Sequence, residues 1–149
     1  MINKKAFTLI ELVVVIAVIA ILIGIALPRM KGMQDEARIQ KAKTELKTLQ
    51  TAIESFYIHQ NPNAYPDSSE EIVGDVLISA SPQIITSELY DPFSDGSSEY
   101  IYYRSDNELY YVIHSLGVDG EEDIEGILDD GTLDGDDDDD IYVTNGTGF

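Results

Sequence analysis

The chain has 149 residues, no cysteine and a formal net charge of −19, from 9 basic and 28 acidic residues. The lack of cysteine excludes disulfides, thiolate metal sites and thiol catalysis, so a core, partners or a metal ion must hold the folded part together. Residues 115–149 carry thirteen acidic side chains and no basic one. Phosphates would be repelled by that end, which argues against nucleic-acid binding.

An apolar segment lies close to the start of the chain. Residues 12–27 contain no polar side chain, and together with residues 7–11 they form a helix candidate about 31 Å long at about 1.5 Å per residue. That length matches the hydrocarbon core of a bilayer, and a domain this small cannot hide a helix that is apolar on every side. We therefore predict a membrane span over residues 7–28. A secretory signal peptide is the alternative, although the apolar run is long for one.

Glu11 is the charged residue inside this apolar segment. A charged side chain at the centre of a membrane costs about 2.5–3.5 kcal/mol on insertion scales, and such residues usually have a partner and a role. From the residues alone two interpretations are open. Glu11 either lies near a helix N-terminus, where the helix dipole favours an anion, or it serves a function with a charged partner.

The segment KKAFTLIELVVVIAVIAILIGIALP resembles the N-terminus of type IV prepilins and of the pseudopilins of type II secretion. The shared features are a short basic leader over residues 1–6, Phe7, Glu11 and Pro28 at the end of the apolar run. The resemblance implies that a prepilin peptidase cuts between Ala6 and Phe7 and that Phe7 is N-methylated, although the family usually has glycine before the cut. It also implies that Glu11 pairs with the Phe7 amine of a neighbouring subunit during assembly.

Residues 29–60 are predicted to continue the helix with one apolar face. The apolar positions recur at spacings of three and four, and they are Ile39, Ala42, Leu46, Leu49, Ile53 and Phe56. Such a stripe is expected to pack on the chain's own head, with a coiled-coil seam as the alternative. Gly24 and Pro28 weaken the helix between its two halves, either as a simple kink or as a stretch that loosens on assembly.

Residues 61–149 are predicted to form a small head. Two runs rich in tyrosine and β-branched residues predict an antiparallel hairpin over about residues 99–114. Residues 141–144 are expected to add a third strand, while Ser68 and Glu71 form a capping box for a short helix. A sheet that packs on the C-terminal part of the long helix gives an α+β, pilin-like fold.

The acidic region 115–141 contains five consecutive aspartates, Asp136 to Asp140. Adjacent carboxylates repel one another, so they either stay solvated or collect a hard cation, for which calcium is the natural choice. The spacing is not that of an EF-hand. From chemistry alone, a calcium site and a disordered, solvated tail both remain open.

A second resemblance covers about residues 91–142. Asp91-Pro92-Phe93, the hairpin, the loop 115–120 and the acidic stretch before Ile141 are together similar to the major pseudopilin of type II secretion. The resemblance implies one calcium ion, held by carboxylates and main-chain carbonyls, that stabilises the head. Carried over to this chain, the ligands are the carbonyl of Leu116 and the side chains of Asp119 and of one or two of Asp138, Asp139 and Asp140.

Residues 121–135 are an insertion relative to the shorter loop of that family. The insertion is itself acidic, so a second ion at Asp129, Asp130 and Asp134 is a further hypothesis. The role of these fifteen or so residues is otherwise open from the sequence.

The resemblance predicts a structural protein and not an enzyme, since no nucleophile–base set, phosphate loop or zinc-spaced pair is present. It implies a homopolymer, the major pseudopilin, that drives protein export with an inner-membrane assembly platform and minor pseudopilins. Before assembly the subunit would cross the inner membrane once, surrounded by lipid, with its head in the periplasm. The alternatives are a type IV pilin of a surface fibre, for adhesion, motility or DNA uptake, and a membrane-anchored calcium-binding surface protein.

Overall fold

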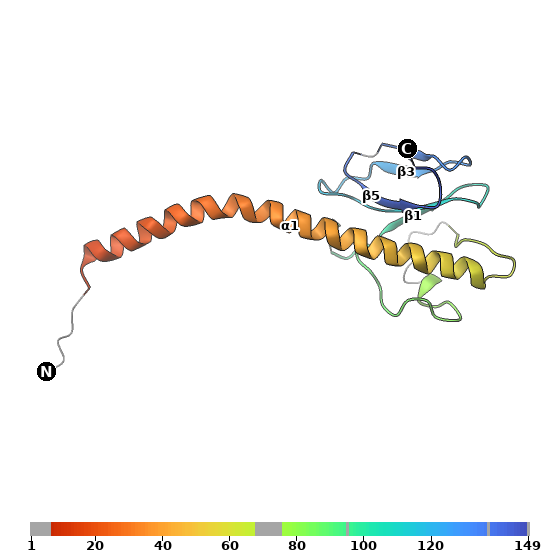
Figure 1. Ribbon diagram of the computed structural model, residues 1–149, viewed down its shortest axis with the longest axis horizontal. Helices are drawn as coiled ribbons and strands as arrows, with labels where there is room; N and C mark the ends of the chain where they lie inside the picture. The colour runs from red at the N-terminus through yellow and green to blue at the C-terminus, as the bar shows by residue number, and fades with distance from the viewer. Residues whose placement is uncertain (1–6, 68–75, 95, 137, 149) are drawn as a thin grey trace. The chain divides into compact units, whose positions relative to one another are not determined.

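The computed structural model describes residues 7–67, 76–94, 96–136 and 138–148, and of residues 26–30 it describes the backbone alone (Figure 1). The chain divides into two compact units, Met1–Glu36 and Ala37–Phe149. Helix α1 (Leu9–His59) contributes its first part to one unit and its remainder to the other. The predicted helical segments 7–28 and 29–60 thus fall on one continuous helix, which contains Pro28 and ends at His59, one residue before the predicted end.

The described part of the first unit is almost entirely helical. All side chains from residue 7 to residue 25 are exposed, and the large apolar ones expose between 43% (Val13) and 84% (Phe7) of their surface. Within the part of the chain that the structure describes, no helix reaches the combination of length and hydropathy that crossing a membrane requires.

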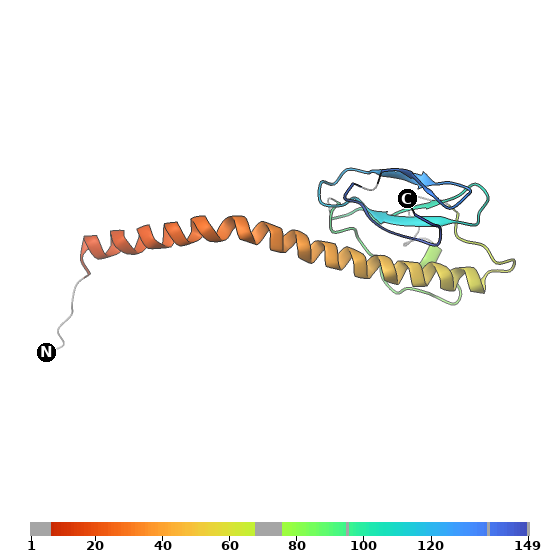
Figure 2. The same ribbon diagram turned by 45° about the horizontal axis from the view of Figure 1, so that its top comes forward.

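The second unit has three layers, which are the C-terminal part of α1, a three-stranded sheet and a two-stranded ribbon (Figure 2). The antiparallel sheet has the order β1–β2–β5, with β1 (Ile101–Arg104), β2 (Tyr111–Ser115) and β5 (Ile141–Thr144). The ribbon pairs β3 (Ile124–Ile127) with β4 (Leu133–Gly135). The fold is therefore α+β and pilin-like, and both the predicted hairpin and the predicted third strand are confirmed.

Strand β2 lies between two apolar layers, and all five of its residues are buried. Successive side chains of a strand point to opposite faces of the sheet. Tyr111 and Ile113 accordingly belong to the core against α1, whereas Val112 packs with the ribbon. The helix side of the main core contains most of the predicted stripe. Ala42, Leu46, Leu49 and Ile53 are buried, and Ile39 and Phe56 are half-buried. Ala52, which was not predicted, is buried beside them. The stripe thus packs on the chain's own head.

The ribbon β3–β4 was not predicted, because residues 121–135 have no run of β-forming residues long enough to indicate strands. Three of the four apolar side chains in this acidic segment form the inner face of the ribbon, where Ile124, Ile127 and Leu133 pack around Val112. Burial of these few side chains anchors the insertion to the sheet. The capping box predicted at Ser68 and Glu71 falls on residues 68–75, which lie outside the described residues.

Candidate functional site

The loop that follows β2 is held at its start by Asp91, whose side chain is almost completely buried. Its Oδ1 accepts hydrogen bonds from the Ser115 hydroxyl at 2.6 Å and from the Phe93 amide at 3.0 Å. Its Oδ2 accepts one from the Leu116 amide at 2.9 Å. A buried carboxylate needs several donors to offset its lost hydration. Asp91 therefore fixes the direction in which the chain leaves the sheet.

A second carboxylate holds the far side of this loop. Oδ2 of Asp139 accepts hydrogen bonds from the amides of Val118 at 2.5 Å and Asp119 at 3.1 Å. The loop approaches Asp139 closely at Gly117, which has a φ of +67°. A Cβ atom added there would lie 2.6 Å from Oδ1 of Asp139, closer than real Cβ atoms come to other atoms. A glycine is therefore required at this point by both the backbone conformation and the available space.

These contacts bring three carboxylates together beside the loop. Asp119, Asp123 and Asp139 each offer an oxygen within 4.8 Å of the others. Oδ2 of Asp123 and Oδ1 of Asp139 are buried and have no hydrogen-bond partner among the described residues. Burial raises the pKa of Asp123, and the nearby carboxylates raise it further. Buried carboxylate oxygens without donors, in a cluster of like charges, are suited to a hard cation such as calcium.

The structure divides the predicted ligands into two groups. Asp119 and Asp139 lie in the cluster, and the half-buried Leu116 begins the same loop. Asp138 is exposed to solvent. The Asp140 side chain is instead completely buried and contacts His114. Whether any of these residues binds an ion remains a prediction.

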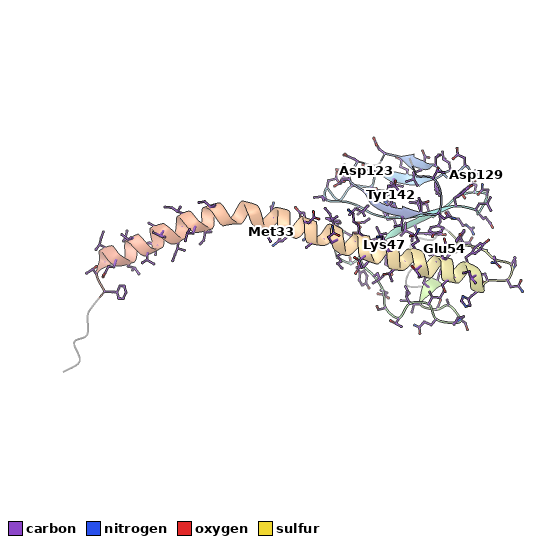
Figure 3. The ribbon with its side chains drawn as sticks, viewed as in Figure 1. Met33, Lys47, Glu54, Asp123, Asp129 and Tyr142 are labelled. Carbon is purple, nitrogen blue, oxygen red and sulfur yellow. The ribbon has the colours of Figure 1, made fainter. Side chains whose placement is uncertain are left out.

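Asp123 is the member of the cluster that the sequence did not indicate. It belongs to the insertion and directly precedes β3, so its place depends on how the ribbon packs and not on any local motif. Figure 3 shows Asp123 and Asp129 at opposite ends of the ribbon.

Two of the three carboxylates proposed for a second ion, those of Asp129 and Asp130, have local roles, and the third, Asp134, is exposed. Oδ1 of Asp129 accepts a 2.8 Å hydrogen bond from the Asn107 amide, which joins the hairpin turn to the ribbon. Oδ1 of Asp130 accepts from the hydroxyl and the amide of Thr132, and these bonds lower the pKa of Asp130. Within the described ranges, Asp119, Asp123 and Asp139 are the only acidic group close enough to share an ion.

At the other end of the chain, Thr8 and Glu11 form a capping box at the start of α1. Oε2 of Glu11 accepts hydrogen bonds from the Thr8 amide at 2.9 Å and from the Thr8 hydroxyl at 2.8 Å. The Glu11 amide lies 3.3 Å from the same hydroxyl oxygen, which accepts from it. This reciprocal pattern satisfies donors that a helix N-terminus otherwise leaves open. Ala6 lies outside the described residues, as does the side chain of Pro28.

Two family models match neighbouring parts of the chain. A family described as the prokaryotic N-terminal methylation motif matches residues 1–27, and the family of type II secretion system protein G matches residues 29–132. The chain belongs to the type II secretion system protein G family. Members are pseudopilins, which are structural and not enzymatic, and which occupy the inner membrane before they assemble into filaments. The predicted family and the predicted lack of enzymatic activity are thereby confirmed.

Curated relatives fall into two groups. Type II secretion system core protein G of Pseudomonas aeruginosa is 26% identical over 126 residues, which cover 80% of this chain and 87% of the relative. The protein of the same name from Vibrio cholerae serotype O1 is 25% identical over 132 residues, or 83% and 87% of the two chains. Type IV major pilin protein PilA of Myxococcus xanthus is 43% identical, but over 70 residues, or 47% of this chain and 31% of the relative.

The match therefore spans less than half the length of that pilin, while it spans most of the length of the core G proteins. No solved structure shows a significant match to the chain.

Proposed function

We propose that this chain is the major pseudopilin that polymerises into a filament and so drives protein export by type II secretion. The observation that carries this function is the match to the protein G family over residues 29–132. The helix before this region supports it, because its apolar side chains are exposed from Phe7 to Ile25 in the single chain. An all-apolar helix surface of this size needs lipid or other protein to cover it. Lipid would cover it before assembly, and neighbouring copies would cover it in the filament.

The processing steps follow from the N-terminal methylation motif. A prepilin peptidase would cut between Ala6 and Phe7, and the new amine of Phe7 would be methylated and remain positive. The subunit would cross the inner membrane once through residues 7–28, with its head in the periplasm. It would then enter the filament with the help of the inner-membrane assembly platform and minor pseudopilins.

Glu11 would direct the assembly. Its carboxylate would meet the Phe7 amine of the neighbouring subunit in the apolar core of the filament, where an ion pair offsets the cost of burying each charge. The capping box with Thr8 uses Oε2 of Glu11, and it holds the carboxylate at the helix N-terminus close to its own Phe7. The same residue can thus serve as a local cap in the monomer and as an ion-pair partner in the polymer.

The head would hold one calcium ion beside the loop 115–120. The side chains of Asp119, Asp123 and Asp139 fit this group, since two of their oxygens are buried and no described residue donates to them. By the family resemblance, the carbonyl of Leu116 would add a main-chain ligand. The ion would replace repulsion between carboxylates with attraction and would tie three acidic segments together. Binding to the folded protein alone stabilises it by about 2.7 kcal/mol at one hundred times Kd.

The calcium centre is tested on the full-length protein in detergent micelles. Thermal unfolding is followed in excess calcium and in excess chelator, with magnesium as the ion control. Calcium should raise the melting temperature by on the order of 10 °C. Equal melting temperatures in calcium and chelator would show that the head does not bind calcium at this site. The proposed filament function does not depend on this result.

The filament function is tested in the organism's own cells. A strain that lacks the gene should fail to release type II substrates, and the wild-type chain should restore release. Mass spectrometry of the membrane fraction should find Phe7, methylated, as the first residue. Normal secretion in the deletion strain, together with loss of surface fibres in electron micrographs, would favour the type IV pilin, the alternative that the likeness to the Myxococcus protein supports.

A further inference from the structure

A buried histidine–aspartate pair lies directly beneath the acidic cluster. Nδ1 of His114 is 3.1 Å from Oδ2 of Asp140, and the side chains of both residues are completely buried. His114 belongs to the central strand β2, and its ring stacks on that of Tyr103 in β1 with centroids 5.9 Å apart. The pair is therefore fixed to the middle of the sheet.

The same carboxylate oxygen also binds the main chain of the insertion. Oδ2 of Asp140 accepts hydrogen bonds from the amides of Asp123 at 3.1 Å and Ile124 at 3.0 Å. Ile124 is the first residue of β3, and Asp123 carries one of the three clustered carboxylates. Asp140 thus links the central strand to the point at which the ribbon begins.

Asp139 and Asp140 are adjacent but act on opposite sides of the chain. Asp139 binds amides of the loop 115–120 and joins the cluster, whereas Asp140 binds His114 and the main chain under the cluster. The chain bends at Asp139, whose side chain is half-buried, whereas the side chain of Asp140 is completely buried. Asp140 lies outside the set of oxygens that could share an ion.

We propose that His114 and Asp140 form a positioning brace, which holds the main chain at Asp123 and Ile124 and so aims the Asp123 carboxylate at Asp119 and Asp139 before any ion binds. Asp140 acts through hydrogen bonds and is not a ligand. Its benefit for ion binding rests on the proposed calcium centre, while the brace itself is a property of the ion-free head.

The physical need for a brace comes from the like charges of the cluster. Three carboxylates within 4.8 Å repel one another, and this repulsion favours conformations in which the insertion moves away. Main-chain hydrogen bonds to a fixed carboxylate oppose that movement. A site that is already in place binds its ion more tightly, because less ordering remains to be done on binding. His114 offsets part of the cost of burying the Asp140 carboxylate, because its Nδ1 donates a hydrogen bond to Oδ2 of Asp140.

The first test measures amide hydrogen exchange in the ion-free protein. Full-length protein in detergent micelles is studied by NMR in excess chelator. The amides of Asp123 and Ile124 should be protected in the wild type, and Asp140→Ala should reduce their protection at least about tenfold, or roughly 1.4 kcal/mol of local opening free energy. Asp140→Asn, which keeps an acceptor oxygen, should restore most of it. Asp119→Asn removes a cluster carboxylate and so lessens the repulsion, and it should not lower the protection. Unchanged protection in Asp140→Ala would overturn the brace.

A second pair of variants covers the case in which Asp140→Ala does not fold. His114→Asn places an amide donor near the position of Nδ1, whereas His114→Gln places one near Nε2. His114→Asn should keep the protection of Asp123 and Ile124, and His114→Gln should lose it. Equal protection in the two variants would overturn the role of His114.

The consequence for the ion is measured separately by calcium titration of the same proteins. Loss of a partner that orients a ligand costs about 10-fold to 100-fold in metal affinity. Calcium affinity should therefore fall by at least tenfold in Asp140→Ala and in His114→Gln, and Asp140→Asn should recover most of it. A loss in Asp140→Asn equal to that in Asp140→Ala would instead make Asp140 a charged ligand and overturn its positioning role. If the wild type binds no calcium, the proposed calcium centre is wrong. The hydrogen-exchange measurements, which are made without calcium, would still test whether His114 and Asp140 hold the main chain in place.

Discussion

The hydroxyl group of Tyr111 donates a 2.9 Å hydrogen bond to Oε1 of Glu54 and so joins the central strand β2 to α1. Burial raises the pKa of the Tyr111 hydroxyl, and Glu54 raises it further as an acceptor and a negative charge. The hydroxyl therefore stays protonated and donates at any physiological pH. A second bond of the same kind runs from Tyr100 to Glu45 at 2.7 Å. Between them lies the apolar stripe of α1, so the helix is attached to the sheet by both apolar and polar contacts.

Removal of this bond should destabilise the head measurably. Tyr111→Phe leaves the ring in the core but leaves Glu54 without its main donor, so the free energy of unfolding should fall by about 1.5 kcal/mol. The measurement is urea denaturation of the full-length protein in micelles, followed by tyrosine fluorescence. Tyr103→Phe is the matched control, because the Tyr103 hydroxyl donates to the exposed Glu122 and its loss should cost about 0.5 kcal/mol or less. Equal losses in the two variants would contradict a special role for the buried bond.

The close approach of Gly117 to Asp139 predicts a sharp difference between two glycines. Gly117→Ala must adopt a left-handed conformation, which costs about 1–2 kcal/mol, and must also push Asp139 away. Calcium should then raise the melting temperature much less than it does in the wild type. Gly126→Ala is the control, since nothing lies within 4 Å of a Cβ added there. A full calcium response in Gly117→Ala would show that the loop can move without loss of the site.

Asp123→Asn should have opposite effects with and without calcium. Burial first, and then the carboxylates of Asp140, Asp119, Asp138 and Asp139, raise the pKa of Asp123 above its ordinary 3.8. The ion-free folded state therefore binds the proton more tightly than the unfolded state, so this group adds stability at low pH and loses it as pH rises through the raised pKa. An asparagine imitates the protonated form and should raise the melting temperature in chelator at neutral pH.

In excess calcium the same variant should melt below the wild type, because a ligand is missing. In chelator the difference between the two proteins should shrink as pH is lowered toward about 4, where the wild-type carboxyl is increasingly protonated. Thermal unfolding at a series of pH values checks both signs. If Asp123→Asn is less stable than the wild type in chelator at neutral pH, repulsion within the cluster is not a significant cost.

The elements that were predicted from the sequence are those that local periodicity specifies. Apolar spacings of three and four between Ile39 and Phe56 predict the buried face of α1, and the two tyrosine-rich runs predict β1 and β2. The ribbon was missed because Ile124, Ile127 and Leu133 are too sparse to indicate strands, and they become a core only when they meet Val112. Long-range packing of this kind leaves no local pattern in the sequence.

The acidic cluster was predicted only in part, and the cause is again that long-range packing leaves no local pattern in the sequence. Which of the consecutive aspartates points outward depends on the register of β5, and this register is set where Ile141 pairs with Ser115. A shift of one residue would exchange the positions of Asp139 and Asp140. The run of aspartates therefore indicates that an ion is chemically reasonable, but it does not distinguish a ligand from a buried hydrogen-bond acceptor. Asp123 enters the cluster through the ribbon, which the sequence did not predict.

Two roles of Glu11 can be separated by two substitutions at the start of α1. Glu11→Gln keeps an acceptor for Thr8, since glutamine also completes a capping box, but it removes the negative charge. Thr8→Ala does the reverse, because it removes the hydroxyl and keeps the charge. If Glu11 pairs with the Phe7 amine of a neighbour, Glu11→Gln should abolish filaments and secretion, whereas Thr8→Ala should leave both close to normal.

The measurement is recovery of sheared filaments, together with release of type II substrates, from a deletion strain that expresses each variant at equal membrane levels. Processing at Phe7 is checked by mass spectrometry in both variants, so that a cleavage defect is not mistaken for an assembly defect. A capping role alone predicts the opposite pattern, because loss of a cap costs about 1 kcal/mol of helix stability whatever the charge of its partner. Normal filaments from Glu11→Gln would mean that the buried charge is not what joins one subunit to the next.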